Sequence, residues 1–188
     1  MSPQQTADIK RLLESDSETL FRAADSERKK LCGEPVHVRG IVEFSNLCSR
    51  NCFYCGLRRS NSNLKRYIMP LDDILFVSED AARVGVGTIV LQCGESDEIP
   101  ANFIASAVAA LKQKLGVAVT ISAGVRTADA FKSWKEAGAD RYLLKFETAS
   151  KRIYEKTHDR DSSFDERVSA LETLRLLGYQ VGAGAMIG

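Results

Sequence analysis

Residues 88–122 read TIVLQCGESDEIPANFIASAVAALKQKLGVAVTIS, and this run sets the fold class. It opens with a short apolar strand candidate, residues 88–92, and closes with a second one, residues 117–122. Residues 101–115 between them read as a helix. Apolar strands joined by a helix are typical of a parallel sheet built from right-handed βαβ units.

The same alternation continues in both directions along the chain. The predicted strands are residues 36–44, 88–92, 117–122, 141–146 and 180–186, and the predicted helices are residues 1–30, 70–85, 101–115, 127–137 and 163–177. A spacing of roughly 25–30 residues per unit matches an α/β fold of the (β/α) TIM-type barrel class. Because about five units are visible, we expect an incomplete barrel, a fragment of a full one. Residues 1–35 are predicted to form an N-terminal helical segment, and residues 36–188 the N-terminal part of the barrel.

Composition excludes several classes of protein. The chain has 188 residues, 44% of them hydrophobic and 27% charged, with a formal net charge of +1. This balance predicts no nucleic-acid partner, and no run approaches the ~20 apolar residues of a membrane span. The N-terminus lacks the apolar core of a signal peptide, so a cytoplasmic protein is expected. Five cysteines, three of them clustered, favour metal binding in a reducing compartment over disulfides.

Three cysteines follow the first predicted strand at close intervals, Cys48, Cys52 and Cys55. One short loop therefore directs three sulfurs at one place, which favours a [4Fe-4S] cluster. Three thiolates leave the fourth iron without a protein ligand, and an open iron is a place to bind and reduce a cofactor. The alternative is a structural zinc site with Cys93 as fourth ligand.

A second candidate segment, Gln92-Cys93-Gly94-Glu95, follows the next strand. Glycine at a strand end lets the backbone approach a ligand and leaves carbonyl groups free to accept from an ammonium group. An ordinary turn between strand and helix remains the alternative. Active sites of (β/α) barrels lie at this rim, where the cysteine loop also falls.

Polar side chains continue along the same rim on later strands. Thr120 and Ser122 share one face of their strand, and the barrel lumen is the predicted face. Lys145 and Glu147 are also two apart and either pair with each other or bind a charged ligand. Arg167, early in a helix, either reaches a carboxylate at the rim or is a solvated surface residue. No role is predicted for three residues outside these segments, Cys32, His37 and His158.

The cysteine loop with aromatic Tyr54 before its last cysteine resembles the signature of the radical S-adenosylmethionine (radical SAM) superfamily. Residues 41–67 resemble the [FeFe]-hydrogenase maturase branch, the HydE family, within the biotin synthase and methylornithine synthase group. Further similarity runs through residues 88–92, 117–120 and 134–144. The resemblance covers nearly everything after about residue 36.

The resemblance implies a [4Fe-4S] cluster on the three cysteines and S-adenosylmethionine (SAM) at its open iron. One-electron reduction would cleave SAM to methionine and a 5′-deoxyadenosyl radical, with electrons from a reduced ferredoxin- or flavodoxin-type donor. Gly94 and its neighbours Cys93 and Glu95 would meet the SAM ammonium group. The remaining residues implied to bind SAM or line its cavity are Tyr54, Thr120, Ser122, Lys145, Glu147 and Arg167.

Departures from the maturase pattern leave the substrate open. Maturases resembling this chain usually show serine at Cys93, histidine at Phe146 and glutamate at Val125, whereas residues 122–125 resemble methylornithine synthase. The leading hypothesis is a hydrogenase-maturase-like radical SAM enzyme acting on a small amino-acid-derived or thiol-containing substrate. One alternative is a methylornithine-synthase- or biotin-synthase-like enzyme. The other is an inactive truncated half-barrel that only binds a cluster or zinc.

Overall fold

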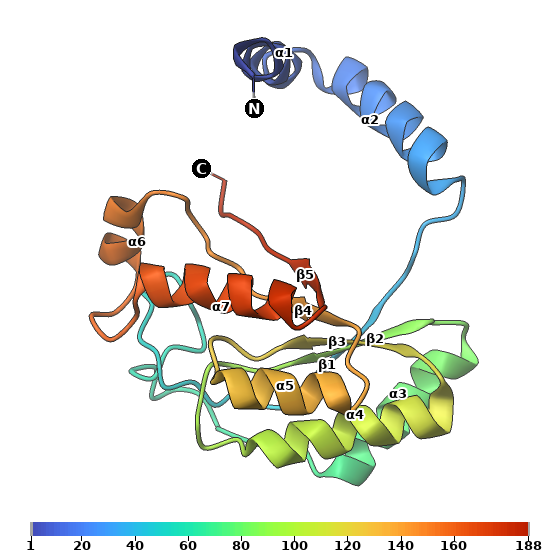
Figure 1. The fold of residues 1–188 in the computed structure, drawn as a ribbon, viewed down its shortest axis with the longest axis vertical. Helices are drawn as coiled ribbons and strands as arrows, with labels where there is room; N and C mark the ends of the chain where they lie inside the picture. The colour runs from blue at the N-terminus through green and yellow to red at the C-terminus, as the bar shows by residue number, and fades with distance from the viewer. Residues whose placement is uncertain (1, 188) are drawn as a thin grey trace. The chain divides into compact units, whose positions relative to one another are not determined.

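Five parallel strands form one sheet whose spatial order follows the chain. The computed structural model describes residues 2–187 (Figure 1). The strands are β1 Gly40–Glu43, β2 Thr88–Gln92, β3 Ala118–Ser122, β4 Arg141–Leu143 and β5 Gln180–Gly182. Each pairs in parallel with the next, in the order β1-β2-β3-β4-β5. The predicted parallel α/β architecture is confirmed.

Helices connect the strands and pack on one face of the sheet. Those on the sheet are α3 Leu71–Arg83, α4 Ala101–Leu115, α5 Ala128–Glu136 and α7 Phe164–Leu176. The short helix α6 Lys151–Thr157 contacts α7. Helix α3 contacts α4, α4 contacts α5, and α5 contacts α7, so successive helices lie side by side (Figure 1). One apolar layer therefore joins these helices to the sheet.

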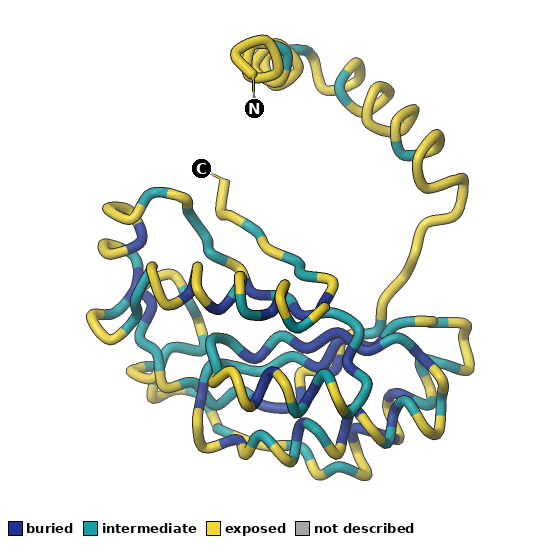
Figure 2. The backbone as a smooth tube through the Cα atoms, in the orientation of Figure 1, coloured by how far each residue is buried: buried dark blue, intermediate teal, exposed yellow. Residues whose placement is uncertain are grey.

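Alternation along the strands separates this core from the opposite face. Val119 and Ile121 of β3 are fully buried in the apolar core. Their neighbours Thr120 and Ser122 point to the other side, because successive side chains of a strand alternate. Figure 2 shows the buried positions concentrated on the strands and on the sheet-facing sides of the helices.

The core contains polar aromatic residues whose polar atoms are paired. The Trp134 indole N–H donates to the Ala101 carbonyl at 2.8 Å, and the Tyr142 hydroxyl donates to the Gly124 carbonyl at 2.8 Å. The second bond ties the core to the rim of the sheet, where the polar segments lie. Large aromatic rings thus fix the loop after β3 as well as filling the core.

Some predicted element boundaries were wrong. Strand β1 begins at Gly40 instead of residue 36, because its pairing with β2 begins at Gly40 opposite Ile89, and β2 itself extends only one residue further back, to Thr88. Strands β4 and β5 end earlier than predicted, although the Leu144 N–H still donates to the Gly182 carbonyl. The sequence interpretation also missed the short helix α6.

The chain divides into two units, Met1–His37 and Val38–Gly188. The first unit holds two helices, α1 Pro3–Leu13 and α2 Ser17–Cys32, where one helical segment was predicted. The break falls where Asp16 caps α2 by accepting from the Thr19 N–H. Neither helix contains a buried residue. Within residues 2–187, no helix combines the length and apolar character that crossing a bilayer requires.

Candidate functional site

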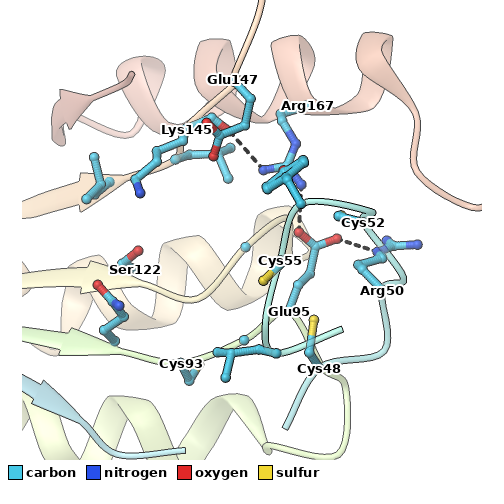
Figure 3. Close-up of a pocket in the computed structure, with 17 residues that line it drawn as sticks. Cys48, Arg50, Cys52, Cys55, Cys93, Glu95, Ser122, Lys145, Glu147 and Arg167 are labelled. Carbon is cyan, nitrogen blue, oxygen red and sulfur yellow. Dashed lines mark hydrogen bonds and ion pairs between the residues drawn. The ribbon is translucent and has the colours of Figure 1, made fainter. Parts of the chain in front are cut away.

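A cavity lies at the carboxyl ends of the strands, where the candidate segments meet (Figure 3). Its volume of about 200 Å³ is far above the ~10–15 Å³ that one water needs. Its lining residues are Cys48, Arg50, Cys52, Tyr54, Cys55, Leu57, Gln92, Cys93, Gly94, Glu95, Ser122, Gly124, Leu143, Leu144, Lys145, Glu147 and Arg167. The site is therefore large enough for a ligand, and three free thiols open into it.

The cysteine loop, residues 48–55, is irregular and is held by bonds from other segments. The Ser49 N–H donates to the Glu95 carbonyl at 2.7 Å, and the Phe53 N–H donates to the Thr157 carbonyl at 3.0 Å. The Asn51 N–H donates to the Asp159 carboxylate at 2.7 Å. The loop is thus fixed between the segment after β2 and the α6–α7 connection.

Gly94 is the point where the segment after β2 meets the cysteine loop. A Cβ atom at this position would stand 2.3 Å from the Leu47 carbonyl oxygen and 2.7 Å from Cys48 Cβ. Glycine was predicted here for close approach to a ligand. The structure shows close approach to the loop that carries the thiols, so Gly94 also sets where Cys48 lies.

Glu95 is the centre of an ion network at the rim (Figure 3). Arg50 of the cysteine loop donates from Nε to Glu95 Oε1 at 2.6 Å, and Arg167 of α7 donates from Nη2 to Oε2 at 2.9 Å. The Val125 N–H also donates to Oε2, at 2.9 Å. Gly124 leaves the room for this carboxylate, since a Cβ there would lie 2.4 Å from Glu95 side-chain atoms. One carboxylate therefore joins the loops after β1, β2 and β3 to α7.

Arg167 is buried, so the surface interpretation of this residue is wrong. It also donates to the Tyr154 hydroxyl at 2.9 Å and to the Lys145 carbonyl at 3.0 Å. Burial is the largest single influence and lowers the pKa of Arg167, but Glu95, Tyr154 and Tyr54 together outweigh it, and the net effect is a raised pKa. The side chain is a fixed cation at the edge of the cavity.

His158 also has a definite place in the site, although no role was predicted for it. Its Nε2 lies 2.8 Å from the Tyr54 hydroxyl, and its Nδ1 lies 3.0 Å from the Tyr154 carbonyl. A carbonyl only accepts, so Nδ1 carries the hydrogen and Nε2 accepts from Tyr54. Burial lowers the pKa of His158, which favours this neutral form. The imidazole therefore ties the cysteine loop to α6.

Lys145 and Glu147 both line the cavity, but within the described chain they form no ion pair with each other. Glu147 has φ 62°, a left-handed conformation that non-glycine residues rarely adopt. Its N–H donates to the Gly184 carbonyl and its carbonyl accepts from the Met186 N–H. The segment after β5 thus holds Glu147 in this conformation, and its carboxylate has no hydrogen-bond or ion-pair partner among residues 2–187.

Ser122 lies in the cavity, and Thr120 lies one layer deeper on the same face of β3. Thr120 pairs in register with Val90 on one side and Arg141 on the other. The Thr120 hydroxyl and Arg141 Nη1 are buried and have no hydrogen-bond partner within residues 2–187. Buried polar groups are normally satisfied, so this layer has hydrogen-bonding capacity for a polar ligand.

Cys93 differs from the other rim cysteines. It packs against the apolar core, and burial raises the pKa of its thiol to about 12. No three His, Cys, Asp or Glu side chains among residues 2–187 converge as a single-ion site would require. The structure therefore does not group Cys93 with the loop cysteines around one metal ion.

Most predicted site residues line one cavity, and their roles as ligands stay predictions. Sequence reasoning missed four residues that organise the site, Arg50, Arg141, Tyr154 and His158. Arg50 had a signal, because it stands between two cysteines of the loop. The others are joined to the site only by the fold.

Comparisons with known proteins agree with this geometry. The family model for the radical SAM superfamily matches residues 42–188. The [FeFe] hydrogenase maturase subunit HydE of Thermotoga maritima is 48% identical over 172 residues, which are 92% of this chain and 49% of that protein. A biotin synthase of Corynebacterium jeikeium is 26% identical over 98% of this chain and 52% of its own length.

The fold has a close counterpart among solved structures. The crystal structure of methylornithine synthase (PylB) matches with a TM-score of 0.88 and 28% identity, over 97% of this chain and 55% of that chain. The chain thus spans about half the length of the relatives it matches. The sheet, the cysteine loop and the family match agree, and the chain belongs to the radical SAM superfamily.

Proposed function

We propose that this chain is the cluster- and SAM-binding part of a hydrogenase-maturase-like radical SAM enzyme. The observation that carries the proposal is the opening of three thiols, Cys48, Cys52 and Cys55, into one rim cavity that Glu147 and Lys145 also line. The three thiolates would hold three irons of a [4Fe-4S] cluster and leave one iron open. When bound, the cluster supplies one electron that cleaves the sulfonium carbon–sulfur bond of SAM, which gives methionine and a 5′-deoxyadenosyl radical.

The donor set fits a cluster better than zinc. A structural zinc ion needs four donors about 2.0–2.3 Å from one centre. The side chains of residues 2–187 form no such group. In a four-iron cluster each cysteine binds a separate iron, so the sulfurs stand apart around a cube. Three free cysteines on one short loop, all lining one cavity, are the donors that such a cluster takes.

The other cavity residues supply polar contacts for the rest of SAM. Arg167 is a fixed cation suited to a carboxylate, and Glu147 offers a free carboxylate to an amino group or ribose hydroxyls. Glu95 shares its single negative charge between Arg50 and Arg167, so a net positive charge remains there, and the main role of Glu95 is to hold the loop in place. Cys93, Gly94 and Tyr54 would form the walls on either side.

A small amino-acid-derived or thiol-containing substrate would enter the lumen beyond Ser122. Arg141 Nη1 and the Thr120 hydroxyl lie in that direction, both buried and without partners in the described chain. A cation beside a hydroxyl group is suited to a carboxylate. The carboxylate of such a substrate would give both groups a hydrogen-bond partner. The electron would come from a reduced ferredoxin- or flavodoxin-type protein.

Methylornithine-synthase-type chemistry is the second candidate. The TM-score of 0.88 at 28% identity and Val125 beside the site favour it. The two candidates are distinguished by their products. The reconstituted protein is given a small amino acid in one reaction and a thiol-containing substrate in another, and the products are identified. A mutase gives a rearranged amino acid with no loss of atoms, and its appearance would replace the maturase assignment.

Anaerobic reconstitution tests the proposal. We expect about four iron and four sulfide per chain, and 5′-deoxyadenosine after addition of SAM and dithionite. Cys52→Ala should abolish the cluster absorption, whereas Cys32→Ala, in the N-terminal unit, should leave it intact. One zinc per chain and no SAM cleavage would contradict the proposal and favour a half-barrel without redox function.

A further inference from the structure

The chain concentrates positive charge around the cysteine loop. Residues 44–71 contain five basic residues and no Asp or Glu, namely Arg50, Arg58, Arg59, Lys65 and Arg66. The whole chain has a formal net charge of only +1, so the remainder carries a net negative charge. Single-sign charge at one place in a balanced chain is a signal for a charged partner.

The loop that carries this charge, residues 56–66, is built against the cysteine loop. Arg66 donates from Nη1 to the carbonyls of Asn46 and Leu57, at 2.6 and 2.9 Å, and from Nη2 to that of Arg58 at 2.8 Å. The Arg59 N–H donates to the Arg50 carbonyl at 2.8 Å. The basic residues are therefore held in place and do not belong to a loose tail.

Three of these charges are available to a partner. Arg58, Arg59 and Lys65 form no ion pair within residues 2–187, whereas Arg50 forms one with Glu95. Arg59 and Lys65 are exposed. Arg58 donates from Nη1 to the Cys55 carbonyl at 3.1 Å, so the charged surface begins at a thiol-bearing residue.

An exposed aromatic residue stands beside these charges. Phe53 lies between Cys52 and Cys55 in sequence, and 70% of it is accessible to solvent. Its backbone is fixed by the bond to the Thr157 carbonyl. Aromatic residues and arginine are enriched in protein–protein contacts, so an exposed Phe53 close in sequence to Arg58 and Arg59 fits the composition of one.

We propose that Phe53, Arg58, Arg59 and Lys65 form the docking surface for an electron-carrier protein with an acidic face. The inference rests on the proposed function, because reductive cleavage of SAM needs one electron from outside the chain. One electron leaves the reduced carrier and enters the oxidised cluster, and no bond or proton passes between the proteins. The surface is contiguous with the Cys52–Cys55 segment, so a carrier bound here is close to its electron acceptor.

Binding of a reduced acidic flavodoxin to the 188-residue chain, measured by calorimetry at 50 and 300 mM NaCl, tests the surface directly. Reversal of two exposed charges, in Arg59→Glu/Lys65→Glu, should weaken binding at least tenfold at 50 mM salt and less at 300 mM. The matched control is Lys114→Glu. Lys114 is exposed and unpaired in the described chain, at the end of α4 remote from the cysteine loop. The Lys114→Glu variant should bind flavodoxin as tightly as wild type does.

Reduction kinetics of the reconstituted protein add a second readout. With flavodoxin hydroquinone, the cluster absorption of Arg59→Glu/Lys65→Glu should bleach at least tenfold more slowly than that of wild type. With the methyl viologen radical, a small reductant that needs no docking surface, the two rates should agree within about twofold. A variant that slows equally with both reductants has a damaged cluster site, and this result would overturn the docking assignment.

The outcomes separate the two proposals. If no cluster forms but flavodoxin binds with the expected charge and salt dependence, the proposed function fails and with it the electron-transfer role, while the binding surface for an acidic protein stands. If the cluster forms and cleaves SAM while flavodoxin binds the reversed variant as tightly as wild type, the docking surface is wrong and the function stands. Displacement of flavodoxin by a single-stranded oligonucleotide of higher affinity would also overturn the assignment, in favour of a nucleic-acid surface.

Discussion

Replacement of Glu95 by glutamine tests whether one carboxylate holds the rim together. Glu95 Oε1 accepts from Arg50 at 2.6 Å, and Oε2 accepts from Arg167 and from the Val125 N–H, both at 2.9 Å. Glutamine has one oxygen and one amino group, so it must turn a donor toward at least one of these donors. The Arg50 side is the less buried and should take the mismatch.

The magnitude follows from the buried position of the group. Loss of one charge-assisted hydrogen bond costs about 1.5–3 kcal/mol. Two guanidinium groups are then left without their shared negative charge, and disrupting a buried ion pair costs about 3–5 kcal/mol. We therefore expect Glu95→Gln to lower the free energy of unfolding by about 3 kcal/mol. That is a large part of the ~5–15 kcal/mol typical of a domain.

Urea unfolding of the cluster-free chain, followed by circular dichroism, measures this change. The matched control is Asp97→Asn, because Asp97 is fully exposed and Arg126 keeps its bonds to the carbonyls of Ser96 and Ile99. The control should unfold as wild type does. A Glu95→Gln midpoint and slope equal to those of wild type would refute the assignment of Glu95 as the centre of the rim network.

Three further comparisons of variants test other parts of the site. Gly124→Ala should destabilise the chain by about 3 kcal/mol or more, and Gly116→Ala by about 1–2 kcal/mol; both have positive φ, but only Gly124 also faces a clash at 2.4 Å. Equal losses in urea unfolding would contradict this reasoning. Gly94→Ala should lower the iron content after reconstitution and Gly56→Ala should not, since only the first adds a clash with the cysteine loop. Equal iron contents would contradict the inference that Gly94 positions this loop. Burial lowers the pKa of His158, so its stabilising effect is present above its unfolded pKa of ~6.5 and lost as pH falls through the folded value. Wild type should therefore lose stability between pH 7 and 5 more steeply than His158→Gln, and parallel pH profiles would argue against a buried neutral imidazole.

The fold class and the cysteine loop could be predicted because their signals are local. Residues 88–92 form a short apolar run, which is typical of a buried strand. The spacing of Cys48, Cys52 and Cys55 leaves only a few kinds of metal site, an iron–sulfur cluster or zinc. Strand limits were less predictable. Residues 36–39 have strand-like composition, but the pairing with β2 begins only at Gly40, and pairing depends on the partner as much as on propensity.

The contacts that organise the site could not be predicted, because they join distant residues. Arg50 and Glu95 are 45 positions apart, and Tyr54 and His158 are 104 positions apart. Neither arginine nor histidine in a polar stretch reveals whether it is solvated or buried. His158 gains its place only when α6, a helix too short for a periodic signal, brings it under the cysteine loop.

The match between strand order and chain order has a consequence for synthesis on the ribosome. Each ladder joins a strand to the next one made, so a nascent chain is able to add strands one by one as it emerges. Arg167 follows Glu95 by 72 positions, a delay of roughly 4–14 s at ~5–20 residues per second. Until then Arg50 is the only one of the two arginines available to the Glu95 carboxylate, so the network that holds the thiol-bearing segment is completed only when α7 is made.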